Sequence, residues 1–171
     1  MSVVIETTAA VASTVADNLF QVLLGRSKEE RERRQSSAGQ LVAALSPIVQ
    51  ELRMFEDRRR PKWWKKNLRR LYALLDNLEP ELPTQWRHLK RSIRDSVGSA
   101  VGGGVVFVDL VPVPDDADLT QPSRWTMHAA DYLDGCQRVI RRWGHLRSAR
   151  GARHVTIPDF NAWVDVFNLQ D

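Results

Sequence analysis

The chain has 171 residues, enough for one domain that buries about 70% of its unfolded surface. Its composition of 43% hydrophobic and 27% charged residues lies near the average of globular proteins and excludes wholesale disorder. A single cysteine excludes both an internal disulfide framework and a cysteine-rich zinc site. It is also typical of a reducing compartment, so we expect a cytoplasmic protein.

The net charge of +4 is unevenly distributed along the chain. Residues 58–94 contain twelve Lys and Arg but only three acidic residues, whereas residues 109–118 contain four aspartates. Clustering of this kind attracts polyanions, or it allows the basic and acidic parts of one chain to pair. In the second case the acidic segment masks the basic one.

Apolar residues at helical spacing predict a first helix over residues 3–24, ended by Gly25. Its stripe consists of Val4, Val11, Val15, Leu19 and Val22. Because the segment contains only two charged residues, we expect both of its flanks to be covered, by the rest of the domain or by a second copy. It lacks the basic region of a signal peptide, and Asp17 costs about 3 kcal/mol in a bilayer, so we do not expect stable membrane insertion.

Residues 27–37 are polar on all sides and hold three opposite-charge pairs at i,i+4: Lys28–Glu32, Glu29–Arg33 and Glu30–Arg34. These pairs favour a solvent-exposed helix over a simple charged connector. A second apolar stripe follows, in Leu41, Leu45, Ile48, Leu52 and Phe55. Pro47 lies inside this stripe, which makes Ser46 either a helix N-cap or the site of a kink.

Two amphipathic helices with basic outer surfaces are predicted next. The apolar stripe of the first is Trp64, Leu68, Leu71, Leu75 and Leu78, and that of the second is Trp86, Leu89, Ile93 and Val97. Pro80 and Pro83 end the first helix, and Gly98 ends the second. So short a connection predicts an antiparallel hairpin.

Residues 102–122 form an excursion from the helical pattern. Its β-branched part, residues 105–114, contains Pro112 and Pro114, which limit it to an edge strand or an extended segment. The longest helical seam of the chain follows, in Trp125, Ala129, Tyr132, Cys136, Val139, Trp143 and Leu146. Residues 156–159 look like a capping box that opens a short final helix with Phe160, Trp163, Val164 and Phe167.

These elements predict an all-α fold. We expect a single helical domain over residues 1–171, an antiparallel bundle of five or six helices with one extended excursion around residues 102–122.

No motif predicts catalysis, and we expect neither a metal nor a cofactor. The four histidines do not pair at i,i+3 or i,i+4, and no HExxH motif occurs. Cys136 lies on the seam and is better explained as a small buried hydrophobe than as a nucleophile. An RNase-like helical enzyme is a residual hypothesis, because Arg138…His145 and Arg147…His154 have the Arg–His spacing of helical ribonucleases. Such pairs are about as frequent as chance predicts.

The predicted hairpin carries the candidate site for nucleic acid or another polyanion. Its cations are Lys62, Lys65, Lys66, Arg69 and Arg70 on the first helix and Arg87, Lys90, Arg91 and Arg94 on the second. Trp63, on the border of the apolar stripe, is placed to stack on a base. A solvated outer surface explains the same residues more simply than a polyanion site, and anionic lipid is a less favoured alternative.

The sequence therefore favours a non-enzymatic helical interaction protein. Its partner is a second copy or another protein, bound through apolar helix faces such as the stripe of residues 4–22. The alternative is a helical protein that binds nucleic acid through the basic surface of residues 58–94.

Overall fold

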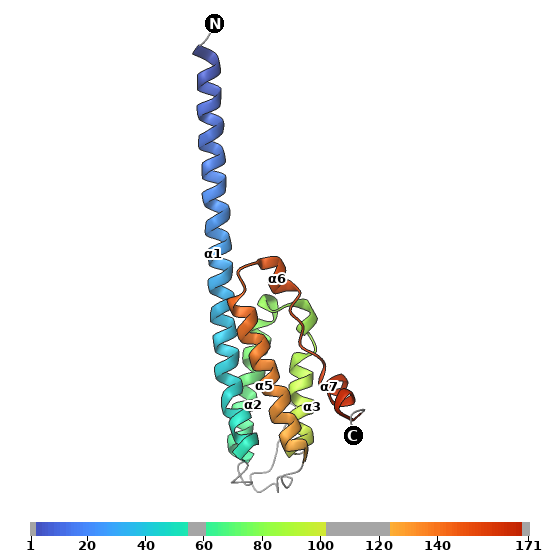
Figure 1. The fold of residues 1–171 in the computed structure, drawn as a ribbon. Coiled ribbons are helices and arrows are strands. Elements are labelled where there is room, and N and C mark those ends of the chain that lie inside the picture. The colour runs from blue at the N-terminus through green and yellow to red at the C-terminus, as the bar shows by residue number, and fades with distance from the viewer. Residues whose placement is uncertain (1–2, 55–60, 102–123, 169–171) are drawn as a thin grey trace.

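The computed structural model describes the backbone of residues 3–54, 61–101 and 124–168, and the side chains of residues 25–54, 62–101 and 125–166. The described residues form helices and contain no β-strand, so the predicted all-α fold is confirmed (Figure 1). The extended segment predicted over residues 105–114 and the acidic residues 109–118 lie outside the described residues.

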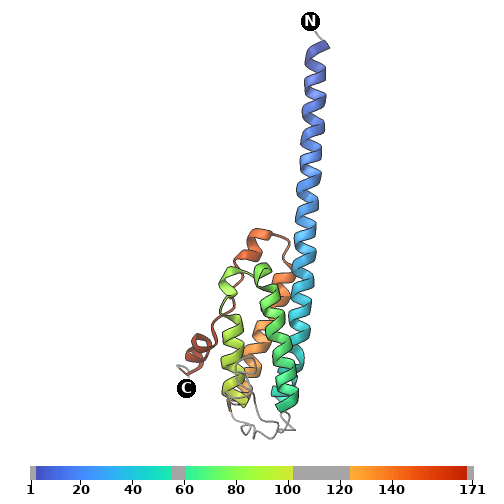
Figure 2. The ribbon, with the colours of Figure 1, turned by 180° about the vertical axis from the view of Figure 1, so that it is seen from behind.

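Four helices form an up-and-down bundle. They are the C-terminal half of α1 (Val3–Met54), α2 (Pro61–Leu78), α3 (Leu89–Val101) and α5 (Arg124–His145), and two short helices, α6 (Ala149–Arg153) and α7 (Phe160–Asn168), follow them. Consecutive helices of the bundle run in opposite directions (Figures 1 and 2). α1 packs mainly on α5 and α2, and α3 packs on α5 and α7.

α1 is a single helix of 52 residues, so the prediction of a first helix that ends at Gly25 is wrong. One glycine costs a helix only about 1 kcal/mol relative to alanine, and good helix formers stand on both sides of this one. The continuous helix favoured for residues 27–37 is confirmed. Of its predicted charge pairs, Lys28–Glu32 is present with 3.9 Å between Nζ and Oε1. Arg34 instead donates from Nη2 to the carbonyl oxygen of Leu146, at 2.9 Å.

Pro47 lies within α1, so Ser46 is not an N-cap. Proline has no N–H to bond the carbonyl four residues earlier, and this weakens the helix locally. Polar side chains are concentrated at this turn. Ser46 Oγ donates to the carbonyl oxygen of Val42 at 2.7 Å, and Gln137 Nε2 of α5 donates to Ser46 Oγ at 3.0 Å. Gln137 is only 4% exposed, so this polar link lies inside the α1–α5 interface.

The predicted apolar stripes form the core. Buried members are Leu41, Leu45, Ile48 and Leu52 of α1, Trp64, Leu68, Leu71, Leu75 and Leu78 of α2, and Leu89, Ile93 and Val97 of α3. Phe55 lies outside the described residues. Trp86 is buried too, but in a 3-10 turn (Thr84–Trp86) before α3. α3 does not end at Gly98 as predicted, because Ala100 and Val101 beyond it are buried and continue the packed face.

The turn between α2 and α3 is made of two 3-10 helices, Glu79–Glu81 and Thr84–Trp86. The two prolines end α2 as predicted, and the hairpin is antiparallel (Figure 1). The indole of Trp86 donates from Nε1 to the carbonyl oxygen of Val155 at 2.8 Å. This bond ties the segment between α6 and α7 to the top of the hairpin.

α5 is the central helix of the bundle. The seam residues Ala129, Tyr132, Cys136 and Trp143 are buried, and so are Leu133 and Ile140 beside them, because α5 packs against α1 and α3 at once. Near its C-terminal end the backbone closely approaches α1: a Cβ atom at Gly144 would lie 2.6 Å from the Cβ of Ala38. Glycine is therefore required at this crossing.

α7 begins after Asp159, close to where the sequence predicts its start. The cap is Asp159 itself, whose Oδ1 accepts from the backbone N–H of Asn161 at 3.0 Å. Ser92 of α3 accepts from the N–H of Phe160 at 3.2 Å and donates to Asp159 Oδ2 at 3.1 Å. Thr156, the first residue of the predicted capping box, is exposed.

Candidate functional site

The predicted interface residues Val4, Val11, Val15, Leu19 and Val22 all lie on the N-terminal half of α1. Figures 1 and 2 show from opposite sides that this half continues beyond the ends of the other described helices. Residues 3–24 span about 33 Å at the rise of an α-helix. The sequence allowed this segment to be covered either by the rest of the domain or by a second copy. No described helix of the bundle lies beside it (Figures 1 and 2).

The basic residues predicted on α2 have mostly exposed side chains. Lys62, Lys66, Arg69 and Arg70 are exposed and Lys65 is half-buried. On the opposite side of α2, the stripe from Trp64 to Leu78 faces the core. The helix therefore presents a cationic outer surface, as its sequence predicts.

The cations predicted on α3 are more closely tied to the fold. Lys90 Nζ lies 2.8 Å from Asp76 Oδ2 and 5.5 Å from the centre of the Tyr72 ring, and Arg94 lies over the same ring at 5.2 Å. Arg91 Nη2 lies 2.6 Å from Asp159 Oδ2. The contacts of Lys90 and Arg94 place α3 beside α2, and all three cations are engaged within the fold. Arg87 is exposed but does not lie on α3 as predicted, because it caps the preceding 3-10 helix.

Trp63 is half-buried and packs against the core. Its ring meets that of Trp64 edge to face, with 5.1 Å between centroids. The border position predicted for it is therefore observed, and the side chain covers the edge of the core. Stacking on a nucleic-acid base stays a prediction.

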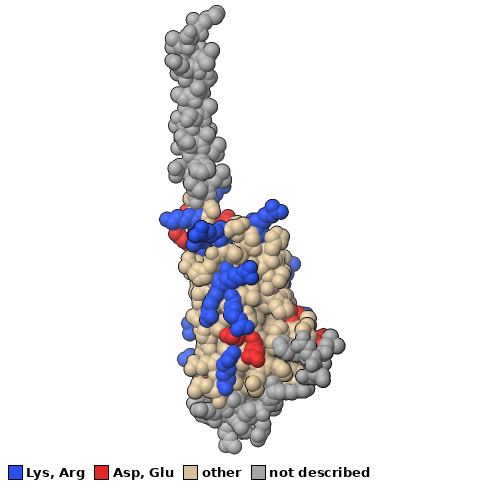
Figure 3. All heavy atoms as spheres, viewed as in Figure 1, with Lys and Arg blue, Asp and Glu red and all other residues tan. Residues whose placement is uncertain are grey.

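Cations also gather on the face shown in Figure 3, over α1 and α5. α5 carries the exposed residues Arg138, Arg141 and Arg142. Acidic residues are interspersed among them: Arg138 Nη1 lies 2.8 Å from Asp134 Oδ2, and Arg53 lies 3.5 Å from both Asp131 and Asp134. This second face carries mixed charge, unlike the outer surface of α2.

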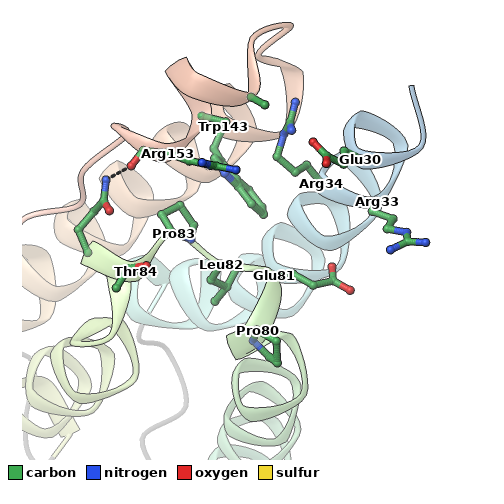
Figure 4. Close-up of a pocket in the computed structure, with 13 residues that line it drawn as sticks. Glu30, Arg33, Arg34, Pro80, Glu81, Leu82, Pro83, Thr84, Trp143 and Arg153 are labelled. Atoms are coloured by element: carbon green, nitrogen blue, oxygen red, sulfur yellow. Dashed lines mark hydrogen bonds between the residues drawn. The ribbon is translucent and has the colours of Figure 1, made fainter. Parts of the chain in front are cut away.

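A pocket of about 540 Å³ lies where α1 leaves the bundle. Its wall combines four separate segments: α1, the α2–α3 connection, the end of α5, and α6 (Figure 4). The charged lining residues are Glu30, Arg33, Arg34, Glu81 and Arg153, and the apolar ones include Leu82, Pro83 and Trp143. Sequence reasoning missed this site, because no local pattern connects residues that lie more than a hundred positions apart.

Three groups of described residues bear on the residual hypothesis of catalysis: the cysteine, possible metal ligands and the Arg–His pairs. Cys136 is buried, and burial raises the pKa of its thiol to about 12 by disfavouring the thiolate. Within the described ranges, no group of three or more His, Cys, Asp or Glu side chains is arranged to hold a metal ion. The ribonuclease-like pairs are exposed or engaged elsewhere: His145 and His154 are exposed, and Arg138 pairs with Asp134.

Where the structure describes side chains, no helix is both long and apolar enough to cross a bilayer. Comparison of the chain with protein-family models, with curated proteins and with solved structures gave no match.

Proposed function

We propose that this chain is a non-enzymatic helical interaction protein that associates through the N-terminal half of α1. The observation that carries the proposal is the extension of this half beyond the described bundle, in a segment with only two charged residues, Glu6 and Asp17. We further propose that the protein acts in the cytoplasm, because its one cysteine suits a reducing compartment.

Helix energetics support an interaction role for this segment. Most helix stability in proteins comes from the packing of an apolar face, because isolated helices are marginal in water. The C-terminal half of α1 obtains that packing from α5 and α2. The N-terminal half has the sequence stripe of Val4, Val11, Val15, Leu19 and Val22 but no described helix beside it. A second helix along this stripe supplies the missing burial.

A second copy of the chain is the simplest occupant. Identical helices offer each other matching stripes, and symmetric dimers are the commonest protein assemblies. A different protein with an amphipathic helix is the other occupant. Both arrangements leave the bundle as a separate folded unit attached to the associating helix.

Size-exclusion chromatography with light scattering on the full chain tests the proposal. We expect a mass that is a multiple of the 19.5 kDa chain, or a defined complex with one co-purifying protein. Samples treated with nuclease at low salt separate protein association from bridging by nucleic acid. A 19.5 kDa monomer at high concentration with no bound protein would contradict the proposal, and so would a monomer that pellets with lipid vesicles.

Binding of nucleic acid through α2 is a second candidate function. It is favoured by the exposed cationic surface of that helix, in particular Lys66 and Arg70. Contacts to phosphates release counterions, so affinity must fall steeply with salt. We expect the α3 cations to add less to the affinity for nucleic acid than those of α2, since Lys90 and Arg91 are paired with carboxylates.

A mobility-shift titration at several salt concentrations tests this candidate. We expect the Lys66→Gln/Arg70→Gln variant to bind DNA or RNA more weakly and with a smaller salt slope, by up to about 0.9 per lost phosphate contact. Arg141→Gln/Arg142→Gln is the matched control, with the same change in charge on α5. Absence of any shifted complex at low salt, or equal effects of the two variants, would exclude an α2 binding surface.

A further inference from the structure

The pocket at the exit of α1 contains charged groups that the fold leaves uncompensated. Three arginines and two glutamates line it, an excess of one positive charge. Within the described part of the chain, no ion pair joins Arg33, Arg34 or Arg153 to a carboxylate. Elsewhere, arginines such as Arg53, Arg91 and Arg138 lie within 3.5 Å of an aspartate. The pocket therefore has a net positive charge, and none of its three guanidinium groups makes an ion pair within the described residues.

Arg34 is held in place without losing its charge. Its Nη2 donates to the carbonyl oxygen of Leu146 at 2.9 Å, an acceptor that carries no formal charge. Its Nε is buried and has no hydrogen-bond partner among the described residues. A buried N–H without a partner costs about 1–3 kcal/mol, so this guanidinium gains from any acceptor that can reach it. Glu81 is already engaged, because it accepts a hydrogen bond from Ser37 Oγ.

The remaining wall is mixed: Thr84 and Gln85 are polar, Leu82 is half-buried, and Trp143 is only 1% exposed. Figure 4 shows Arg34 and Arg153 on either side of Trp143, with Leu82 and Pro83 below them. Trp143 is fixed by the core, where its ring lies 5.3 Å from that of Trp86. The volume of about 540 Å³ is within the range of about 300–1,000 Å³ that is typical of small-molecule sites.

We propose that this pocket binds a small organic oxyanion, a phosphate or carboxylate group joined to a small apolar body. Arg34 and Arg153 hold the oxyanion by charge-assisted hydrogen bonds, which arginine forms well because its planar guanidinium matches such groups. The apolar body lies against Leu82, a half-buried apolar residue of the lining, because Trp143 and Pro83 are buried. This site is independent of association through the N-terminal half of α1.

Isothermal titration calorimetry on the full chain tests the site, with phenyl phosphate, benzoate and inorganic phosphate as probes. We expect phenyl phosphate or benzoate to bind at least about tenfold more tightly than inorganic phosphate, because only they have a ring to place against Leu82. The stronger of the two identifies the oxyanion. No binding of any probe up to about 10 mM would overturn the proposal, as would equal affinities for inorganic and phenyl phosphate.

Arg153→Gln is the diagnostic variant, because Arg153 is exposed and its removal leaves the core intact. We expect it to weaken binding of the preferred probe at least about tenfold while the melting temperature of the free protein stays unchanged. Arg150→Gln is the matched control: Arg150 is exposed on the same helix but does not line the pocket. If Arg150→Gln weakens binding as much as Arg153→Gln, the attraction is general and the pocket is not the site.

Discussion

Gln137 Nε2 lies 3.0 Å from Ser46 Oγ, so α5 hydrogen-bonds α1 at the turn that Pro47 weakens. Both partners belong to the interface between the two helices, and Gln137 is 4% exposed. The same amide also approaches the carbonyl oxygen of Val42, at 3.4 Å. This polar link pairs the Ser46 hydroxyl and the Val42 carbonyl inside the interface, in the turn before the proline.

Replacing this amide tests its role. We expect Gln137→Met to lower the free energy of unfolding by about 1–2 kcal/mol, because Ser46 Oγ and the carbonyl of Val42 then lose a buried donor. Urea denaturation measures the change. Gln50→Met is the control, since Gln50 is exposed on α1, and we expect a change within about 0.5 kcal/mol. Equal losses in the two variants would show that the buried link contributes nothing.

Replacing glycine by alanine should have opposite effects at Gly144, where α5 crosses Ala38 of α1, and at Gly39. We expect Gly144→Ala to destabilise the protein by about 1–3 kcal/mol, because the new Cβ would lie 2.6 Å from the Cβ of Ala38 and separate α5 from α1. Gly39→Ala has open space around its Cβ and should stabilise α1 by about 0.5–1 kcal/mol. Thermal or urea unfolding measures both. A stabilising Gly144→Ala would mean that the helices are less close than described.

We expect the ionised carboxylate of Asp159 to stabilise the folded protein, and this contribution to be lost in acid. A hydrogen bond from Arg91, together with Asn161 N–H and Ser92 Oγ, holds the pKa of this carboxyl below its usual value. A lowered pKa contributes stability that is fully present above the unfolded value of about 3.9 and is lost as pH falls through the folded value. We expect Asp159→Asn to cost about 1 kcal/mol at neutral pH and to flatten the fall in stability below about pH 4.

Denaturant unfolding at a series of pH values measures this effect. Asp165→Asn is the matched control, because Asp165 is exposed on the same short helix. We expect it to keep the wild-type profile. An Asp159→Asn variant with the wild-type acid profile would show that the α7 cap does not depend on the charge of the carboxylate.

The burial of Cys136 predicts that its thiol does not react while the protein is folded. Its thiol is buried and its pKa is raised to about 12, so little thiolate is present or accessible in the folded protein. We expect no reaction with a thiol reagent at pH about 8 under native conditions and one thiol per chain after unfolding in urea. Labelling followed by absorbance measures the rate. Complete labelling of the folded protein within minutes would contradict the burial of this side chain.

The core of the bundle is the part that the sequence predicts best. Periodic apolar residues such as Leu68 and Ile93 form stripes whose burial requires helices packed side by side, and Pro80 stops a helix by its covalent structure. Helix ends at glycine are predicted poorly. Gly25 and Gly98 lie within helices, because a cost of about 1 kcal/mol is small beside the packing or helix propensity of their neighbours.

Tertiary contacts between distant residues could not be predicted. The local spacing of Arg34 and Glu30 favours a pair on one helix, but the fold brings Leu146 to Arg34 and the pair is not formed. The pocket depends on the same long-range approach, with Arg153 and Glu81 reaching it from different elements. The sequence likewise does not show that Lys90 forms an ion pair with Asp76 and lies over the ring of Tyr72, because these residues belong to another helix.

Light scattering of a charged variant of α1 tests the central claim most directly. In the Val15→Asp/Leu19→Asp variant, two acidic side chains replace the middle of the apolar stripe, and their desolvation opposes pairing with another helix. We predict a 19.5 kDa monomer for this variant, whereas the wild-type chain and the control Ser36→Asp, exposed on the same helix, remain associated. A wild-type chain that is already monomeric without a protein partner, or a charged variant that stays associated, would contradict the account.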